Sequence, residues 1–395
     1  MVHNTKGTSR RDILKATGTA VATTGLMGMA SASNGNTVEV NVGYSAESGR
    51  RAALNKATNV TREFAFDALT IEVNQNAIQG LQKRGDVRYV EKNGTMHALA
   101  PKGGSGGGST TAAQQLPWGV DRVDAEVAHA NGETGAGADI AILDTGIDSD
   151  HPDLVANLGA GKAFVKAKGK YAENWDDDND HGTHCAGIAG AANNSEGVVG
   201  VSTEATLHAV KVLDKRGSGS FSDIAAGVEY VADQGWDVGS MSLGASSGSQ
   251  TLQDACQYAV DNGVFLVAAA GNSGPCTDCV GYPAAYDTVM AVGSTTSSDS
   301  LSDFSSTGPE VEIAAPGSNI YSSVPGGSYD TFSGTSMACP HVAGAAGQLA
   351  ANGSSHSQIR SQLTSTAEDI GLASNESGSG LLDVAAALSL DSSDN

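Results

Sequence analysis

Apolar runs of strand length alternate with helical segments over the larger, C-terminal part of the chain. Five runs predict buried strands, at residues 140–144, 207–213, 238–243, 264–269 and 289–292. Four segments predict helices, at residues 181–191, 221–234, 252–262 and 335–350. This alternation predicts an α/β fold with a mostly parallel sheet and helices on both of its faces. In such a sheet, ligand sites lie beyond the carboxyl ends of the strands.

A smaller module precedes this region. Strands are expected at residues 38–42, where valine alternates with polar residues, and at residues 68–73 and 87–91. Helices are expected at residues 50–57 and 75–83. The order strand, helix, strand, helix, strand predicts a small α+β domain of the ferredoxin-like type, too small to be very stable alone.

The first residues have the features of an export signal. Arg10 and Arg11 precede a weakly apolar run at residues 16–30, and residues 30–32 form a small-x-small cleavage pattern. A twin arginine before such a run predicts a Tat signal peptide and a secreted protein. The alternative is a membrane anchor, but the run is too short and too rich in Gly, Thr and Ala.

Composition marks the remaining boundaries. Residues 103–109 contain only Gly and Ser, which predicts a flexible linker. The expected organisation is a signal peptide at residues 1–32, a small domain at 33–100, a linker at 101–113, a large domain at 114–390 and a tail at 391–395.

The formal net charge of −22 is unevenly distributed. Residues 1–113 contain 13 Lys and Arg against 8 Asp and Glu, whereas the rest of the chain contains 9 against 36. An acidic surface argues against nucleic-acid binding, which needs a basic footprint. It is typical of proteins that stay soluble in concentrated salt, where screening weakens charge repulsion. An ordinary acidic secreted enzyme is the alternative.

The chain has five cysteines, so at least one thiol is unpaired within it. Cys276 and Cys279 have the spacing of half a zinc knuckle, but no second pair supplies the other ligands. A disulfide among Cys256, Cys276 and Cys279 is expected instead, with its connectivity open. Cys185 and Cys339 lie among small and apolar residues, which predicts buried thiols.

Three short segments carry the residues of a nucleophilic hydrolase. Asp144 ends a predicted strand, and His181 and Ser336 each begin a predicted helix. A serine nucleophile needs a base to take its proton, and the base needs a carboxylate to orient it. A lone Ser336 would more simply be a helix cap. The occurrence of all three, in this order and among small residues, favours catalysis.

Two neighbouring features refine this interpretation. His181 and His184 could be metal ligands, but the usual helical zinc pair is spaced by four residues with a Glu between, and no third ligand is placed to complete a site. Asn272 follows another buried strand, and a side-chain amide aimed at the scissile carbonyl is what an oxyanion hole needs.

These segments together resemble the subtilisin family of serine endopeptidases. The acidity and the twin arginine resemble its secreted haloarchaeal, halolysin-like branch. The resemblance implies a subtilisin-like fold in which Asp144 orients His181, His181 is the base and Ser336 attacks the peptide bond. It also implies that Asn272 and the Ser336 amide bind the oxyanion.

The small domain resembles the inhibitory propeptide of this family. The resemblance implies that its tail, residues 89–99, lies along the active-site cleft before cleavage. The glycine-rich linker departs from the family pattern, so the mature N-terminus stays open between about Leu99 and Gln114.

The resemblance also assigns the walls of a substrate cleft. The pocket for the residue before the scissile bond would be lined by Ser242, Leu243, Gly244, Ala269, Ala270, Gly271 and Gly281. Gly219 would lie on the facing strand, and Phe221 beside a more distal pocket. Small walls imply a preference for a large apolar side chain.

Residues 193–198 resemble the calcium loop of the family. Calcium prefers several oxygen ligands, including main-chain carbonyls. The matching positions are the side chains of Gln114, Asp153 and Asn194 and the carbonyls of Ala192, Glu196 and Val198. A plain polar turn is the alternative.

An acidic run, residues 176–180, leads directly into His181. We expect its carboxylates to favour the imidazolium and raise the pKa of His181, more so at low salt, so that activity improves as salt rises. The alternatives are a second cation site or a solvated surface.

The leading interpretation is a secreted, self-processing, monomeric endopeptidase. It would act on polypeptides, bind structural calcium, and use its propeptide as intramolecular chaperone and inhibitor, with no nucleic-acid or stable membrane partner. A peptide-binding protein that has lost activity is one alternative, and the complete set of catalytic residues opposes it. A thiol- or metal-dependent hydrolase is another, and no metal constellation supports it.

Overall fold

The computed structural model describes residues 37–99, 113–169 and 172–392. The expected signal peptide, almost the whole linker and the end of the tail lie outside the described residues. Among the residues that are described, no helix is long and apolar enough to cross a membrane.

The N-terminal part is an α+β unit around a four-stranded sheet. Its elements are β1 (Thr37–Tyr44), α1 (Glu47–Leu54), β2 (Ala57–Phe64), β3 (Ala68–Asn74), α2 (Gln75–Gln82) and β4 (Val87–Lys92), with the sheet order β2-β3-β1-β4. This is the ferredoxin-like arrangement that the sequence predicts. The sequence analysis missed β2 because most of its residues are exposed, so the strand has no apolar alternation.

The large sheet has seven strands, in the order β14-β13-β12-β10-β6-β8-β7. These strands are β6 (Asp139–Asp144), β7 (Lys162–Ala163), β8 (Thr206–Lys211), β10 (Val238–Met241), β12 (Phe265–Ala269), β13 (Met290–Thr295) and β14 (Val311–Pro316). All neighbouring strands pair in parallel. The predicted parallel sheet is therefore confirmed, with β7 and β14 as additional edge strands.

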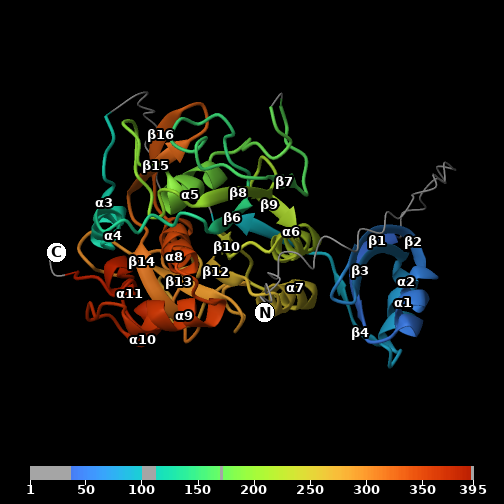
Figure 1. The fold of residues 1–395 in the computed structure, drawn as a ribbon. Coiled ribbons are helices and arrows are strands. Elements are labelled where there is room, and N and C mark those ends of the chain that lie inside the picture. The colour runs from blue at the N-terminus through green and yellow to red at the C-terminus, as the bar shows by residue number, and fades with distance from the viewer. Residues whose placement is uncertain (1–36, 100–112, 170–171, 393–395) are drawn as a thin grey trace, which may run out of the picture. The chain divides into compact units, whose positions relative to one another are not determined.

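Helices cover both faces of this sheet (Figure 1). Their bounds are α5 (His181–Gly190), α6 (Phe221–Gln234), α7 (Gln250–Asp261), α8 (Thr335–Ala351) and α9 (His356–Ser365). Alternate residues of β6 belong to different hydrophobic clusters: Ile140 and Ile142 pack with α5, α8 and α9, whereas Ala141 and Leu143 pack with α6 and α7. A strand buried on both faces reads as a continuous apolar run, which is why the sequence revealed it.

Smaller elements surround the sheet. They are β5 (Thr95–Ala98), α3 (Trp118–Arg122), α4 (Ala125–Ala130), β9 (Ser218–Ser220), β11 (Leu243–Gly244), β15 (Ile320–Val324), β16 (Ser328–Phe332), α10 (Ser374–Ser377) and α11 (Val384–Ala387). Strands β15 and β16 pair as an antiparallel hairpin. Strand β5 lies between β11 and β9 in a separate three-stranded sheet.

Helix α8 lies in the centre of the core, and its glycines allow close packing. A Cβ atom on Gly344 would lie 2.6 Å from Cβ of Val201 and 2.8 Å from the carbonyl oxygen of Ala189. A Cβ atom on Gly347 would lie 2.5 Å from Cδ1 of Ile140. This close packing fixes the start of α8, and with it Ser336, against α5 and β6.

Replacing Gly344 by Ala should destabilise the protein by about 2 kcal/mol, because the added methyl overpacks the contact between α8 and α5. The measurement is chemical unfolding of the full chain. Gly80→Ala is the control, because Gly80 is an exposed helical glycine with open space around it. An equal loss of stability in both variants would contradict the packing argument.

Candidate active site

Asp144 and His181 are in direct contact at the carboxyl end of β6. Nδ1 of His181 lies 2.9 Å from each carboxylate oxygen of Asp144, and both residues are buried. A carboxylate only accepts hydrogen bonds, so Nδ1 carries the proton and Nε2 is left with a free lone pair. Nε2 is buried and has no hydrogen-bond partner among the described residues. In its neutral form the imidazole thus presents Nε2 as the nitrogen that can accept a proton.

The environment of His181 sets its basicity. Burial by itself would lower the pKa of His181, but the carboxylate of Asp144 outweighs this effect, so the pKa lies well above its usual range. Cys185, one turn along α5, is a smaller contributor in the same direction. His184 is different: burial lowers its pKa to about 3, and its ring stacks on Phe332 with Nε2 directed at two main-chain carbonyls.

Ser336 lies in the first turn of α8, where its hydroxyl faces residue 99. Its Oγ is 3.0 Å from the carbonyl oxygen of Leu99 and 3.2 Å from that of Ser242. The side chain of Ser242 in turn donates to the carbonyl of Ser336 at 2.8 Å. The positive end of the α8 dipole points to the same place, which favours negative charge there.

Asn272 completes the surroundings of the Leu99 carbonyl. Its Oδ1 accepts hydrogen bonds from the N–H and the hydroxyl of Thr335, both at 2.9 Å. A main-chain N–H can only donate, so this contact fixes which end of the amide faces Thr335. The Nδ2 group therefore points the other way, 3.4 Å from the carbonyl oxygen of Leu99. The sequence analysis did not identify Thr335 as the residue that orients the Asn272 amide. Its motif shows only that Thr335 lies at the start of a helix.

The tail of the N-terminal unit lies in the cleft as a strand. β5 pairs antiparallel with β9, with Met96 opposite Gly219, and antiparallel with β11, with Ala98 opposite Leu243. Beyond β5, Leu99 donates its N–H to the carbonyl of Ser242 at 3.4 Å. Residues 95–99 thus occupy the position of a bound peptide whose last carbonyl lies at Ser336 and Asn272.

The structure brings most of the predicted cleft residues to this peptide. Ser242, Leu243, Gly244 and Gly219 border β5 directly, and a Cβ on Gly244 would lie 3.2 Å from Leu99. The ring of Phe221 lies against Gly94, and its N–H donates to the Gly94 carbonyl.

The remaining predicted cleft residues are Ala269, Ala270, Gly271 and Gly281. Gly281 donates to the carbonyl of Ala270 at 2.8 Å, and Gly271 precedes Asn272 at the end of β12. No contact between these four and Leu99 is described. Ala269, Ala270 and Gly271 lie between the end of β12 and Asn272, and Gly281 is bonded to them through Ala270.

The residues of the predicted calcium loop are also brought together. Nε2 of Gln114 lies 2.9 Å from the carbonyl of Ala192 and 3.3 Å from that of Val198. Asn194 contacts Asp153 at 3.3 Å. Glu196 belongs to the same loop and donates its N–H to Oδ1 of Asn194.

The burial and charge of Asp153 indicate whether these residues could bind a cation. Its side chain is fully buried, and within the described part of the chain no Lys or Arg is ion-paired with it. A buried carboxylate without a cation is costly. Two carbonyls and amide side chains converge on the same loop, so the oxygen-rich donor set fits calcium.

The cysteines divide into one pair and three thiols. Cys276 and Cys279 form a disulfide, whereas Cys185, Cys256 and Cys339 are free and buried. Cys185 donates to the carbonyl of Ser336 at 3.4 Å, and burial raises the pKa of its thiol, which keeps it protonated. A protonated buried thiol is a poor nucleophile, so the site is not a cysteine-dependent one.

Asp144, His181 and Cys185 are the one group of acidic, His or Cys side chains close enough to hold a metal among the described residues. Two members already bond to each other, and the third donates to a carbonyl. The group is therefore explained by contacts with protein atoms, one of them the carbonyl of Ser336.

The acidic run before His181 is not the solvated surface that was one alternative. Asp176, Asp177 and Asp178 are buried, and only Asp180 is exposed. Asp177 accepts from the N–H and hydroxyl of Thr183, and Asp178 pairs with Lys211. Asp144 is the main group that raises the pKa of His181, and the contacts of Asp177 and Asp178 show that the run also has a structural role. Lys211, a lysine inside an apolar strand, was a signal that the sequence analysis did not use.

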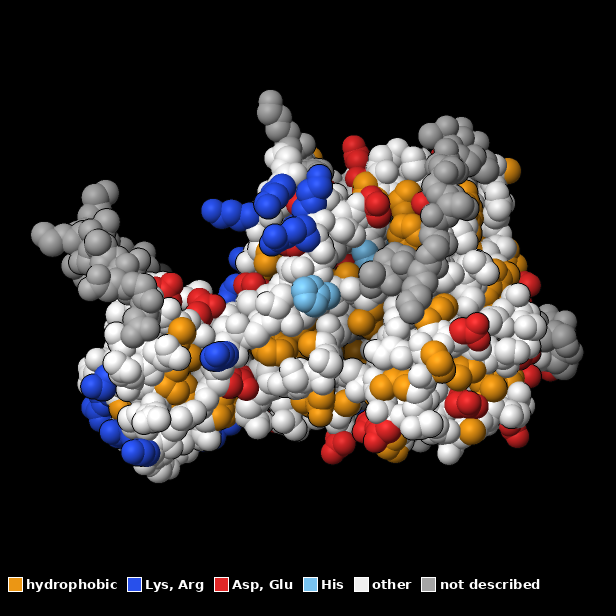
Figure 2. Space-filling view, turned by 180° about the vertical axis from the view of Figure 1, so that it is seen from behind, with side chains coloured by type: hydrophobic (Ala, Val, Ile, Leu, Met, Phe, Trp, Pro, Cys, Tyr) orange, Lys and Arg blue, Asp and Glu red, His pale blue; other side chains and the backbone are white. Residues whose placement is uncertain are grey.

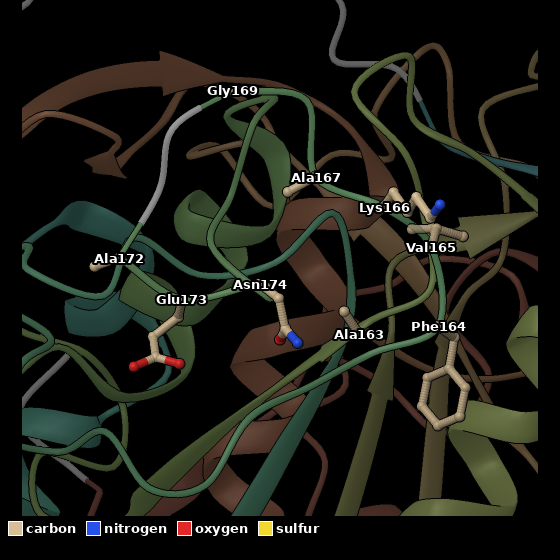
Figure 3. A pocket seen from close by; sticks show the side chains of 9 residues that line it. All are labelled: Ala163, Phe164, Val165, Lys166, Ala167, Gly169, Ala172, Glu173 and Asn174. Atoms are coloured by element: carbon tan, nitrogen blue, oxygen red, sulfur yellow. The ribbon is translucent and has the colours of Figure 1, made fainter.

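A hollow of about 650 Å³ lies elsewhere, between residues 163–169 and 172–174 (Figure 3). No Ser, His or Cys lines it, and no residue of the predicted site belongs to it. The active-site cleft itself is not hollow because residues 95–99 fill it.

Figure 2 shows Lys and Arg side chains in groups on one face, among scattered acidic residues.

Comparisons with known proteins agree with this geometry. Residues 135–381 match the model of the subtilase family. Subtilisin E of Bacillus subtilis (strain 168) is 40% identical over 337 residues, which cover 84% of each chain. An alkaline protease of Shouchella clausii is 43% identical over 321 residues, covering 81% of this chain and 78% of the relative.

A shorter relative, subtilisin Savinase of Lederbergia lenta, is 47% identical over 277 residues, which cover 70% of this chain and 99% of the relative. The matching segment spans the parallel sheet and the residues around Asp144, His181 and Ser336. The chain therefore belongs to the subtilase family of serine endopeptidases.

Proposed function

We propose that this subtilase is a secreted endopeptidase that releases itself by cutting after Leu99. The observation that carries the proposal is the position of the Leu99 carbonyl, 3.0 Å from Oγ of Ser336 and 3.4 Å from Nδ2 of Asn272. A carbonyl held by the nucleophile and a hydrogen-bond donor is in the position of a scissile bond.

We infer one course of reaction, in which the Ser336 hydroxyl turns from the carbonyls of Leu99 and Ser242 to His181. Oγ of Ser336 attacks the Leu99 carbonyl carbon while Nε2 of His181 takes the hydroxyl proton, and Asp144 stabilises the resulting imidazolium. Asn272 and the start of α8 stabilise the oxyanion. The imidazolium then gives its proton to the departing amine, and water releases the acyl group by the reverse sequence.

The side-chain pockets support a preference for large apolar residues before the scissile bond. Leu99 lies against Gly244, where a Cβ would come within 3.2 Å. Met96, three residues earlier, is fully buried in the cluster that contains Leu213, Phe221 and Leu243. Substrates would add a strand between β9 and β11 as β5 does.

Contacts of the N-terminal unit with two helix starts support an inhibitory role. The Glu91 carboxylate accepts hydrogen bonds from Ser249, Gln250 and Thr251 at the start of α7. Asn93 likewise contacts Ser222 at the start of α6. Carboxylates are favourable at helix N-termini, so these contacts would hold the cleaved tail in the cleft.

Calcium is proposed as a structural ion of the loop around Asp153. Gln114, Asp153 and Asn194 would hold it with the carbonyls of Ala192, Glu196 and Val198. When bound, the ion supplies charge compensation for Asp153 and a link between residue 114 and the loop after α5.

Export through the Tat pathway, a monomeric state and adaptation to high salt are proposed on the twin arginine and the net charge of −22.

Ser336→Ala should abolish processing, so that the chain keeps residues 37–99 attached. Mass spectrometry should find Ala100 as the N-terminus of the wild-type mature protein and find no such product in the variant. Ser357→Ala, at an exposed serine of α9, should process normally. Processing by the Ser336→Ala chain would refute the proposed nucleophile.

Leu99→Asp should slow processing about a hundredfold, because a carboxylate would enter a pocket that offers it no described partner. The rate is followed by gel electrophoresis of the full chain. Leu116→Asp, at an exposed leucine beyond the linker, is the control. Unchanged processing of Leu99→Asp at the same bond would contradict the pocket preference.

Chelation should lower the midpoint of thermal unfolding by about 5 °C, since an ion that binds only the folded state stabilises it. Asp153→Asn should lower the midpoint without chelator and respond little to it. Asp287→Asn, at an exposed aspartate, should respond as the wild type does. A full response in Asp153→Asn would place the ion elsewhere.

A further inference from the structure

A lysine ammonium is buried beside the Asp144–His181 pair. Lys211 is 0% exposed, although it carries a charge and lies at the end of an apolar strand. It is directly opposite Asp144 in the pairing of β8 with β6. Lysine is rarely buried completely, because leaving water is costly for an ammonium unless its partners replace the solvent.

The partners of Lys211 come from the two segments that carry the pair. Nζ donates to the carbonyl of Thr145, the residue after Asp144, and lies 2.6 Å from Oδ1 of Asp178, three residues before His181. The other oxygen of Asp178 accepts the N–H of Lys168 at 2.6 Å. One ammonium thus ties the end of β6 to the loop that leads into α5.

The neighbouring contacts extend the same connection. Gly182 donates its N–H to Oγ1 of Thr145 at 2.9 Å, and Asp177 donates its N–H to the carbonyl of Ile147 at 3.2 Å. The carboxylate of Asp177 binds Thr183. The first two bonds join residues 145–147 to residues 177–182, and the bonds between Asp177 and Thr183 hold the loop onto the start of α5. Lys211 contributes the cation among them.

We propose that Lys211 is a positioning residue: its ammonium locks the loop before His181 onto the strand end that bears Asp144 and balances the buried negative charge there. The role rests on the proposed function, since it acts through the Asp144–His181 pair. Lys211 has no described contact with residues 95–99, so it acts on the base rather than on substrate binding.

The charges around His181 determine what removal of Lys211 would do. Asp144 from β6 and His184 and Cys185 from α5 interact with it. Asp177, Asp178 and Asp180 lie in the loop that precedes it, and Asp178 is paired with Lys211. Within the described residues, Lys211 is the only Lys or Arg ion-paired with residues 144 or 176–178. Loss of this positive charge raises the pKa of His181, and loss of Asp178 lowers it.

Three variants separate charge from position: Lys211→Met, Asp178→Asn and the neutral pair of both. The measurement is kcat and KM against pH, with a chromogenic peptide that has the sequence of residues 96–99. Activity falls as His181 becomes protonated, so the acid limb should move up by about half a pH unit in Lys211→Met and down by a similar amount in Asp178→Asn. KM should change little.

The neutral pair should keep the wild-type acid limb and still lose about tenfold in kcat, because the tie between the two segments is gone. Lys162→Met is the control, since Lys162 is an exposed cation on the adjacent strand β7. If Lys211→Met does not fold, the acid limb of Asp178→Asn and the kcat of the neutral pair test the proposal.

Acid limbs that do not move in opposite directions, or a neutral pair with wild-type kcat, would overturn the role of Lys211. Activity that survives in Ser336→Ala would instead overturn the proposed function, so the two failures are distinguishable.

Discussion

The contact between Asp144 and His181 is the interaction around which the site is organised. Each residue is buried, and neither would be tolerated there alone, because a buried carboxylate needs a donor and a buried imidazole needs both nitrogens accounted for. The contact fixes the protonated nitrogen of His181 and raises its pKa. Those two properties make Nε2 the nitrogen through which His181 would act as the proposed base. The fold makes the contact possible, because β6 ends at Asp144, α5 begins at His181, and the two ends lie side by side.

The second constraint is the added strand. β5 completes a small sheet between β9 and β11, and that pairing sets the register of residues 95–99 relative to Ser336. A shift of one residue would turn Met96 out of its pocket and move the Leu99 carbonyl away from Asn272. The same hydrogen bonds would therefore place a substrate and retain a cleaved tail. In the proposed autoprocessing, contacts beyond the cleft, such as those of Glu91 with the start of α7, would decide whether a segment is released as a product or retained as an inhibitor.

The central strands and helices could be predicted from the sequence because their burial follows a simple pattern. Strands β6, β10 and β12 are covered on both faces, so they appear as continuous apolar runs, and α6 has the bounds that its periodicity predicts. Strand β2 was missed because its exposed edge has no such pattern, and β7 because it has only two residues. The acidic run was misread for a related reason: sequence shows the charges but not the donors of Thr183 and Lys211 that bury them.

The sequence by itself determined the fold class and the family, and it predicted Asp144, His181, Ser336 and Asn272 as site residues, because residue types and places at element ends are local properties. Only the tertiary structure decided which disulfide forms, which bond lies at Ser336 and what holds the base. Cys276 pairs with Cys279 rather than Cys256, and the carbonyl of Leu99 reaches Asn272. Such choices depend on distances between segments far apart in the chain. Packing sets those distances, and no local pattern encodes them.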